Sequence, residues 1–391
     1  MSLKVLHIID TLGMGGAETW LMELLRLWHR NGIGQMDFVA TSGQRGVFDE
    51  EAEQLGARVH YVRYGRRNLP AFARAFRQVL REGGYDAVHD HQDYASGWHF
   101  MMGGRVLPKV RVTHVHNPAY QIEMNYGVTL ARRITARIGK RLVALHATHI
   151  AGTSRQVIGE YGFDALRFAH IPKRALHCGF DPARFCGDRA ACRAAMIGEF
   201  GWRQDARIVL FAGRIDHSPD PAHAQAHKNA GFAVDVAIAA ARQDSSVCMV
   251  LAGALSPAVP VLEARIAEAG LAGRIVFAGM RRDIEQLMAG ADVLLFPSRG
   301  EGLGMVAVEA QAAGLPVLAS SAVPRECVVV PGLVRFRELS DGAGAWADDL
   351  LALAERKDDT EASNRMVAGS AFAIWNSADA LEVLYREGRL C

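Results

Sequence analysis

The most informative segment of the sequence is FPSRGEGLGMVAVEAQAAGLPV, which runs from Phe296 to Val317. An apolar strand is expected to end at Phe296, a glycine-rich turn follows, and the pattern predicts a helix from about Leu303 to Ala313. Gly314 ends that helix and Pro316 opens the next strand. A strand, a helix and a second strand in such short succession are typical of a βαβ unit, which builds a parallel sheet covered by helices.

The same alternation of short β-branched runs and helix-length segments continues along the whole chain. Strands are expected at Val5–Ile9, Met36–Ala40, Val59–Val62, Ala87–His89, Val110–Val115, His149–Ala151, Arg207–Ala212, Val247–Ala252, Ile275–Ala278, Val293–Phe296 and Pro316–Ala319. Helices in the first half are expected at Ala17–Arg30, Ala71–Arg81 and Thr129–His146. The sequence therefore predicts an α/β protein with parallel sheets.

A chain of 391 residues is too long for one ordinary core and suits two domains. The stretch from about Phe168 to Asp205 lacks a clear period and is interrupted by prolines and glycines, so we place the interdomain connection there. This gives an N-terminal domain over 1–187 and a C-terminal domain over 188–370. Ligands of open α/β sheets bind beyond the carboxyl ends of the strands, so a cleft between the two domains is the expected ligand site.

The net charge of +2 gives no general case for nucleic-acid binding, but the charge is unevenly distributed. Residues 1–187 contain 24 Lys and Arg against 16 Asp and Glu, a net charge of +8. The remainder contains 20 against 26, a net charge of −6. The basic first half is expected to face an anionic partner or surface.

The six cysteines form neither a CxxC pair nor a metal-ligand spacing, which favours reduced thiols over disulfides or a zinc site. They are Cys178, Cys186, Cys192, Cys248, Cys327 and Cys391. The N-terminus enters the strand-like run LKVLHII without a signal-peptide pattern, and no run of about 18–20 apolar residues occurs. We therefore expect a cytoplasmic protein whose membrane contacts are peripheral.

A glycine-rich turn, DTLGMGGAE from Asp10 to Glu18, follows the first strand and leads into a helix. Gly13, Gly15 and Gly16 would let the backbone approach an anion closely, and the helix N-terminus offers unpaired N–H groups. The turn can therefore cradle a phosphate or a sugar, or it is only a tight βα connection. It lacks both the GxGxxG order and the GxxxxGK[ST] motif, so ATP hydrolysis is not indicated.

Two glutamates in the opening stretch are the main candidate site residues. Glu301 lies at the mouth of the expected helix, where the N–H groups of Gly302, Leu303 and Gly304 could bond a sugar or diphosphate. Glu309 lies two turns further along an otherwise apolar helix and needs polar partners, for which ribose hydroxyls would serve. The spacing alone leaves an alternative open, in which Glu301 caps the helix and Glu309 is a structural carboxylate.

The string EGLGxxxxE followed by AxAxGxPV resembles the signature of retaining GT-B glycosyltransferases, specifically glycosyltransferase family 4. The resemblance extends over nearly the whole chain, through the GGAE turn (Gly15–Glu18), the FAGR segment (Phe211–Arg214) and Lys228. It implies two Rossmann-like domains with parallel sheets that face each other across a cleft. It also implies that a C-terminal helix, at about 371–391, packs back on the first domain.

The resemblance also implies roles for individual residues. Glu301 would contact the donor sugar and Glu309 the ribose hydroxyls. Arg214 and Lys228 would neutralise the diphosphate, and this charge would stabilise the leaving group without a metal ion or cofactor. No DxD motif follows a strand, which supports the expectation of metal independence.

Further roles fall on both halves of the chain. Gly15 and Gly16 would approach the phosphate or sugar. His116, in the run THVHNP, would touch the transferred sugar, with His114 as the alternative register. Arg281 lies where relatives contact the base through backbone, and a surface salt bridge is the alternative.

Two departures from the family pattern affect these assignments. The insertion IDHSPDPAHAQAH (Ile215–His227) separates Arg214 from Lys228, and CGFD (Cys178–Asp181) replaces the usual Asn before Gly in the linker. The irregular spacing of the histidines inside the insertion favours a flexible surface loop over a metal site. They are His217, His223 and His227.

The first half contains acceptor candidates and basic faces. His91 and Asp93, in AVHDHQD, are candidate acceptor ligands or bases, or they satisfy loop backbone groups. In the helix Thr129–His146, the apolar residues at every fourth position are expected to face the core: Leu130, Ile134, Ile138 and Leu142. The basic residues Arg133, Arg137, Lys140 and Arg141 are expected on another side. A second basic set comprises Arg63, Arg66, Arg67, Arg74, Arg77 and Arg81.

Such basic faces suit anionic lipids at the inner face of the plasma membrane, or they are solvated helix surfaces. We therefore expect transfer from a nucleotide-sugar, UDP favoured over GDP, to a glycan or polyprenyl-diphosphate-linked acceptor in exopolysaccharide, capsule or lipopolysaccharide synthesis. The alternatives are a nucleotide-sugar epimerase of the same fold and a non-catalytic nucleotide-sugar-binding subunit.

Overall fold

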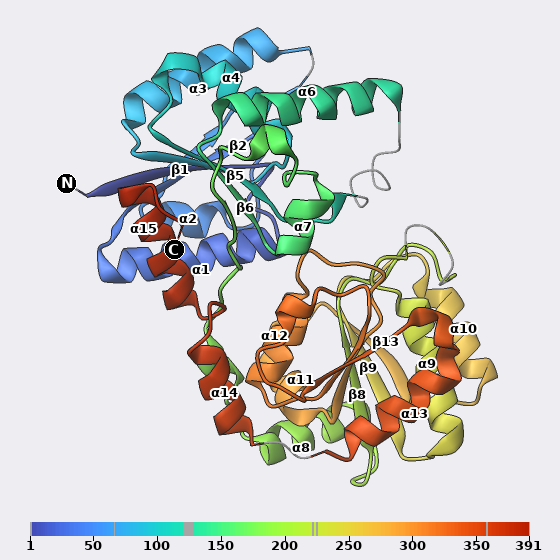
Figure 1. Cartoon of the computed structure of the whole chain (residues 1–391). Coiled ribbons are helices and arrows are strands. Elements are labelled where there is room, and N and C mark those ends of the chain that lie inside the picture. The colour runs from blue at the N-terminus through green and yellow to red at the C-terminus, as the bar shows by residue number, and fades with distance from the viewer. Residues whose placement is uncertain are drawn as a thin grey trace. The chain divides into compact units, whose positions relative to one another are not determined.

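A computed structural model describes residues 2–65, 67–119, 129–220, 223, 226–356 and 359–390. The chain divides into two compact units, each built around its own parallel sheet (Figure 1). One unit comprises Met1–Phe180 together with Ala371–Cys391, and the other comprises Asp181–Ser370. Among the described residues, no helix is long and apolar enough to cross a membrane.

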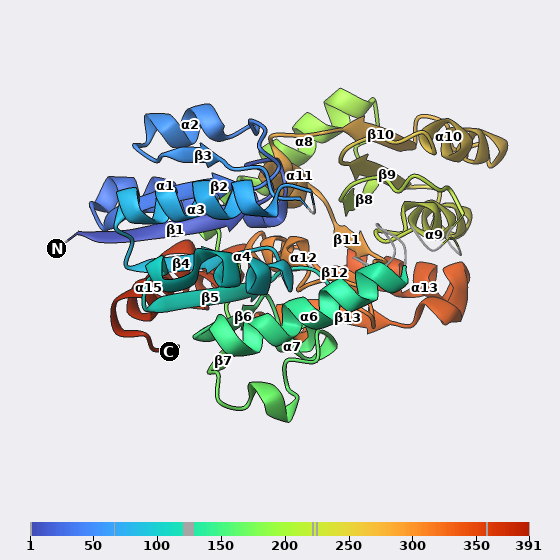
Figure 2. The ribbon, with the colours of Figure 1, turned by 90° about the horizontal axis from the view of Figure 1, so that it is seen from above.

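The first unit contains a seven-stranded sheet in the order β3-β2-β1-β4-β5-β6-β7. Its strands are β1 (Leu3–Ile9), β2 (Gly34–Ala40), β3 (Val59–Tyr61), β4 (Ala87–Asp90), β5 (Val110–Val115), β6 (His149–Gly152) and β7 (Lys173–Ala175). Its helices are α1 (Gly16–Asn31), α2 (Asp49–Gln54), α3 (Leu69–Gly83), α4 (Ala95–Gly103), α6 (Leu130–His146), α7 (Arg155–Glu160) and α15 (Ile374–Glu387). Helices cover both faces of this sheet, so its central strands are largely buried (Figure 2).

The second unit contains a six-stranded sheet in the order β10-β9-β8-β11-β12-β13. Its strands are β8 (Arg207–Ala212), β9 (Val247–Ala252), β10 (Ile275–Gly279), β11 (Val293–Phe296), β12 (Val317–Ser320) and β13 (Val334–Arg337). Its helices are α8 (Arg189–Phe200), α9 (Ala230–Gln243), α10 (Val259–Glu268), α11 (Ile284–Gly290), α12 (Met305–Ala312), α13 (Gly342–Ala354) and α14 (Thr360–Ala368). Both sheets thus have the Rossmann-like arrangement that the sequence predicted.

The unit boundary lies between Phe180 and Asp181, before the position expected from the sequence, 187. The short 3-10 helix Pro182–Phe185 packs against α12 and α14, and Asn364 Nδ2 donates a hydrogen bond of 2.7 Å to the Pro182 carbonyl. These contacts place residues 181–187 with the second unit. The residues after Ser370 belong to the first unit, where α15 packs on α1 and β1.

The strands expected from the sequence occur within one or two residues of their observed ends, but β7 and β13 were missed. Both are edge strands, and both contain arginines, Arg174 in β7 and Arg335 and Arg337 in β13. Charged residues are common on sheet edges, where they weaken the apolar signal of a strand. The helix expected from Leu303 begins two residues later, at Met305.

The orientation expected for α6 is wrong at Leu130, Ile134 and Ile138, although Leu142 is half-buried against α4. Leu130 and Leu145 are about three-quarters exposed, and Ile134 and Ile138 are exposed as well. The helix instead packs on α4 through small residues: a Cβ atom on Gly97 would lie 2.2 Å from the Gly139 carbonyl oxygen. Because glycines allow this close approach, the core-facing side of α6 carries little apolar signal, and the four-residue spacing of larger apolar residues marks its outer face.

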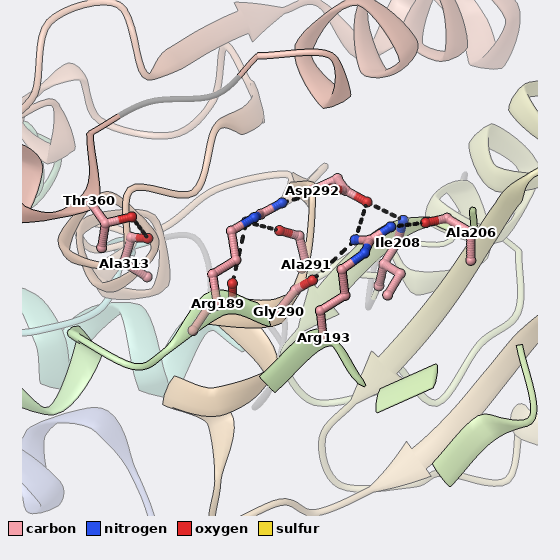
Figure 3. Close-up of polar contacts among 10 residues, drawn as sticks. Arg189, Arg193, Ala206, Ile208, Gly290, Ala291, Asp292, Ala313 and Thr360 are labelled. Carbon is pink, nitrogen blue, oxygen red and sulfur yellow. Dashed lines mark hydrogen bonds and ion pairs between the residues drawn. The ribbon is translucent and has the colours of Figure 1, made fainter. Parts of the chain in front are cut away.

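Asp292 fixes the two strands of the second sheet that lead to the candidate site (Figure 3). It directly precedes β11, and its carboxylate accepts a hydrogen bond of 2.7 Å from the N–H of Ile208 in β8. Arg189 and Arg193 of α8 donate to the same carboxylate at 2.7 and 2.9 Å. One half-buried carboxylate therefore joins α8, β8 and β11.

Candidate functional site

The candidate site residues of the second unit follow two neighbouring strands. β8 pairs with β11 in parallel, with Val209 opposite Val293. The carboxyl ends of parallel neighbours lie at one edge of a sheet, so the segment after Phe211 and the segment after Phe296 lie at the same edge. Arg214 follows the first strand and Glu301 follows the second, as the sequence predicted.

The insertion after Arg214 leads into an ordered turn at the start of α9. Asp216 is buried, and its carboxylate accepts hydrogen bonds of 3.1 Å from the N–H groups of Lys228 and Ala230. Asn229, between them, has a left-handed backbone with φ of 62°. Asp216 thereby brackets the turn that presents Lys228, a role that the sequence analysis missed.

Lys228 and Glu301 form an ion pair. Lys228 Nζ lies 2.6 Å from Glu301 Oε1, and only 11% of the Glu301 side chain and 29% of the Lys228 side chain are exposed. Glu301 therefore does not cap α12, whose N-cap is Gly304 and has no side-chain cap hydrogen bond. The two residues expected to contact the donor sugar and the diphosphate thus lie side by side.

The turn before α12 presents main-chain donors. The N–H groups of Gly302, Leu303 and Gly304 donate no hydrogen bond to any other residue in the described part of the chain. Gly304 has φ of 92°, and a Cβ atom there would lie 2.9 Å from the Phe296 ring. Only glycine fits this position without strain, so the turn is held open at the helix N-terminus, where an anion is favoured.

Glu309 lies on α12 as a half-buried carboxylate. Burial raises its pKa from the usual 4.5 to about 7; the positive charges of Arg184 and Lys228 oppose this shift, and Glu285 adds to it. Among the described residues, none forms a hydrogen bond with its carboxylate. A carboxylate that is partly withdrawn from water gains from hydrogen bonds, which the hydroxyl groups of a ligand could supply.

Arg214 and Arg281 differ in their surroundings. Arg214 is exposed and forms no ion pair with the other described residues. Arg281 pairs with both Glu199 and Asp283, and these carboxylates raise its pKa. Its side chain is therefore engaged in surface ion pairs, and any contact with a base would come from the main chain, as the resemblance implies.

In the first unit, the turn GGAE begins α1. Gly15 is the N-cap, and no side chain caps the helix. A Cβ atom on Gly15 would lie 2.1 Å from a Glu18 carboxylate oxygen, whereas the space around a Cβ atom on Gly16 is open. A side chain at position 15 would displace the Glu18 carboxylate, which is the flexible end of that side chain, while Gly16 leaves room beside the helix N-terminus.

His116 belongs to a cluster of five histidines on one face of the first sheet. The others are His7 of β1, His89 of β4, His91 just after β4 and His114 of β5. His116 Nε2 lies 2.8 Å from His91 Nδ1, and burial lowers the pKa of His116 to about 3. The imidazole is therefore neutral at pH 7. His114, the alternative register, is fully buried and belongs to the same cluster.

Asp93, the other acceptor candidate, is a non-glycine residue with a left-handed backbone, φ 51°. Burial raises the pKa of its carboxyl group to about 7, although the nearby Tyr161 hydroxyl acts in the opposite direction. A carboxyl group with this pKa can exchange a proton near neutrality.

The histidines of the insertion were expected to lie on a flexible surface loop. This expectation is wrong for His227, which is buried next to Lys228, while His217 and His223 are exposed.

Gln311 is another residue that positions the site and was not predicted from the sequence. Gln311 is fully buried: its Nε2 donates to the Ala307 and Cys327 carbonyls, and its Oε1 accepts from the N–H groups of Val329 and Val330. It ties α12 to the segment after β12. A lone glutamine in an apolar helix was the available signal, because a buried amide must find partners.

Two family models match the chain and together cover most of both units. Residues 15–172 match the glycosyl transferase 4-like domain, and residues 206–356 match the glycosyl transferases group 1 domain. The putative glycosyltransferase EpsF of Bacillus subtilis is 29% identical over 353 residues, covering 89% of this chain and 86% of EpsF. The D-inositol 3-phosphate glycosyltransferase of Nocardia farcinica is 31% identical over 330 residues, covering 78% of this chain and 67% of that protein.

The fold also matches solved structures over its full length. The crystal structure of Anabaena HepE in complex with UDP superimposes with a TM-score of 0.75 at 19% identity, covering 97% of this chain and 98% of HepE. The chain therefore has the GT-B fold, and the family models and relatives make it a glycosyltransferase of the hexosyltransferase type, as the sequence predicted. The chain belongs to the glycosyl transferases group 1 family.

Proposed function

We propose that this enzyme transfers a sugar from a UDP-sugar to an acceptor hydroxyl with retention of the anomeric configuration. The observation that carries the proposal is the meeting of three features at one sheet edge. They are the Lys228–Glu301 ion pair, the N–H groups before α12 that bond no other described residue, and the Glu309 carboxylate, which bonds no described residue either. A nucleotide-sugar offers matching groups, namely a diphosphate, sugar hydroxyls and ribose hydroxyls.

The diphosphate would be stabilised by the protein's own charges. Lys228 supplies a partly buried cation, Arg214 supplies an exposed one, and the N-terminus of α12 supplies main-chain donors. Fixed donors of this kind stabilise the charge that develops on a leaving phosphate as the sugar–oxygen bond breaks. We therefore propose that transfer needs no metal ion at the diphosphate.

Three further residues are proposed to bind the other parts of the donor. Glu301 contacts the donor sugar, Glu309 binds the ribose hydroxyls, and His116 contacts the transferred sugar. Gly15 and Gly16 admit a phosphate or sugar beside α1. The preference for UDP over GDP is supported only by structural similarity, because the HepE structures that this chain resembles contain UDP and UDP-glucose.

The acceptor is proposed to be a lipid-linked, phosphate-bearing glycan of a bacterial surface polysaccharide. The outer face of α6 combines exposed Leu130, Ile134 and Leu145 with exposed arginines. The arginines are Arg133, Arg137 and Arg141, and Lys140 lies beside them on the helix. Apolar and basic side chains on one exposed face are typical of helices that lie in the interface of an anionic membrane.

A second basic feature lies near the start of α3. Arg63, Gly65, Arg67 and Asn68 line a cavity of about 410 Å³. Arg66, another member of this basic set, lies outside the described residues. The cavity supports an anionic acceptor group, because guanidinium groups bind phosphate through charge-assisted hydrogen bonds.

A thermal-shift measurement tests the donor proposal. Purified protein is heated with UDP, GDP or ADP, each with and without EDTA, because a ligand that binds only the folded state raises the Tm. We expect UDP to give the largest shift and EDTA to leave it unchanged. Absence of a shift with every nucleotide, or its loss with EDTA, would overturn the donor proposal. Proton NMR of the product tests retention through the anomeric coupling constant.

A further inference from the structure

The histidine cluster has a geometry that its proposed role in sugar binding does not require. His7 lies opposite His89 in the β1–β4 pair, so the two side chains point to the same face of the sheet. His89 and His91 are two residues apart, as are His114 and His116, and side chains two apart in a strand share a face. Two H-x-H pairs at the ends of neighbouring strands thus converge.

The ring nitrogens approach one another at distances suited to a shared ion. His91 Nδ1 lies 2.8 Å from His116 Nε2, and one ligand atom from each of His91, His114 and His116 can be chosen so that all three lie within 4.8 Å of one another. Two nitrogens bound to one zinc ion at about 2.0–2.1 Å in tetrahedral geometry lie roughly 3.3 Å apart. Small side-chain movements would therefore bring the three imidazoles to bonding distance.

One ring nitrogen of the trio His91, His114 and His116 has no hydrogen-bond partner of normal geometry among the described residues. His91 uses both ring nitrogens, one toward His7 at 3.0 Å and one toward His116. The Nε2 atom of His114 is buried and has no hydrogen-bond partner of normal geometry in the described part of the chain, although a main-chain hydrogen bond with Leu176 raises the pKa of this imidazole. A buried nitrogen without a normal partner is unusual and requires an explanation.

The protonation state also suits an ion. Burial lowers the pKa values of all three histidines, with the neighbouring imidazoles acting in the same direction on His91 and His114. The imidazoles are neutral at pH 7, which is the form that ligates metals. His91 and His116 are only half-buried, so the trio is reachable from solvent, whereas the neighbouring trio of His7, His89 and His91 lies deeper.

We propose that His91, His114 and His116 bind one divalent transition-metal ion of the Zn²⁺ type. Three neutral imidazoles are the ligand set that zinc, copper and nickel prefer, and the fourth position would take water or an anion. Cys178 is not a ligand of the same ion, because its sulfur lies 3.9 Å from the opposite ring nitrogen of His116, Nδ1.

The bound ion inhibits the transferase rather than serving it. This consequence rests on the proposed function, in which His116 contacts the transferred sugar, and an ion on Nε2 would remove that nitrogen from the sugar. The charged groups proposed to bind the diphosphate, Arg214 and Lys228, belong to the second unit and do not depend on the ion. Zn²⁺ is therefore expected to lower transfer without abolishing the UDP-induced shift in Tm.

The test measures metal binding directly. Tag-free full-length protein is stripped with EDTA, desalted and titrated with Co²⁺, whose visible absorption reports nitrogen ligation, and Zn²⁺ is then added as competitor. We expect about one equivalent of Co²⁺ to bind and Zn²⁺ to displace it. His91→Gln and His114→Gln should each weaken binding at least about tenfold, whereas His29→Gln, an exposed histidine of the same unit, should not.

Folding of the variants is checked by circular dichroism and by the UDP-induced shift in Tm. If the glutamine variants do not fold, the wild type is treated with diethylpyrocarbonate, and Zn²⁺ should protect the two half-buried histidines, His91 and His116, from modification. Binding that is unchanged in folded His114→Gln, or absence of both Co²⁺ binding and protection, overturns the metal site. Co²⁺ binding without any UDP-induced shift would instead sustain the metal site and overturn the donor proposal.

Discussion

Lys228 Nζ and Glu301 Oε1 lie 2.6 Å apart, so the cation assigned to the diphosphate is already paired with the carboxylate assigned to the sugar. The pair is only partly shielded, and ion pairs near a surface contribute about 1 kcal/mol or less. A diphosphate can therefore compete for Lys228 at little cost. Each residue holds the other in place until a donor supplies partners for both.

Replacing Lys228 with alanine should abolish the UDP-induced shift in Tm and lower transfer at least about a hundredfold, because the leaving phosphate loses its partly buried cation. The same change leaves Glu301 without its ion-pair partner. Thermal shift and a radiolabelled-donor assay measure the two effects. Lys109→Ala, an exposed lysine in the first unit, serves as the control and should behave as wild type. A normal UDP shift in Lys228→Ala contradicts the assignment.

The raised pKa of Glu309 predicts that the free energy of unfolding falls as pH rises. Its pKa is about 7 in the fold and about 4.5 when unfolded, so between these values the unfolded chain loses the proton while the folded chain keeps it. The free energy of unfolding therefore falls as pH rises from 4.5 to 7, by up to about 3 kcal/mol, and the cost stays constant above that range.

Glu309→Gln removes this cost. We expect its Tm to match wild type near pH 5 and to exceed it increasingly toward pH 8, while its transfer activity is lost. Thermal melts across this pH range test the first part. A Tm difference that shrinks as pH rises would show that Glu309 is ionised and favourably paired in the fold.

Alanine substitutions at Gly304 and Gly16 should differ in the strain that they introduce. Alanine at Gly304 would have to adopt φ of 92° and would press on Phe296 and Val323, so we expect a loss of about 1–3 kcal/mol in the free energy of unfolding. Alanine at Gly16 meets nothing within 4 Å and should change stability by less than about 0.5 kcal/mol. Urea unfolding of both variants tests this difference, and equal losses would contradict it.

The outer face of α6 predicts salt-dependent membrane binding. Replacing Arg133, Arg137 and Arg141 with glutamate should release the protein from vesicles that contain anionic lipid, because each basic residue near such a surface contributes roughly 1 kcal/mol. Wild-type binding should weaken at high salt and be absent on neutral vesicles. Co-sedimentation measures both. The matched control replaces Arg242, Arg282 and Arg365 of the second unit with glutamate, which should bind as wild type.

The parts of the fold and site that could be predicted from sequence are those with local signals. Buried strands such as β8 and β11 are continuous apolar runs, and the EGLGMVAVE segment places Glu301, Gly304 and Glu309 by chain geometry alone. The outer face of α6 could not be predicted, because the contact with α4 uses Gly97 and Gly139, which carry no apolar side chain.

The histidine cluster could not be predicted because it depends on strand order. The two H-x-H pairs are visible in the sequence, but only the pairing of β4 with both β1 and β5 brings His7, His91 and His116 together. The role of Asp216 depends similarly on the path of the insertion, whose composition indicates a loop but whose start lies beside the first turn of α9, where Asp216 accepts a hydrogen bond from the N–H of Ala230.

The position of α15 has a consequence for synthesis of the protein. His89 Nδ1 lies 2.5 Å from Tyr385 Oη, and Trp20 Nε1 donates a hydrogen bond of 3.0 Å to Ser377, so residues near both ends of the chain share one core. The ribosome makes the whole of the second unit before it makes these partners. The first unit therefore cannot complete its core until α15 has been synthesised, and the face of its sheet that α15 covers stays exposed until then. The second unit, which is continuous from Asp181 to Ser370, can fold before that.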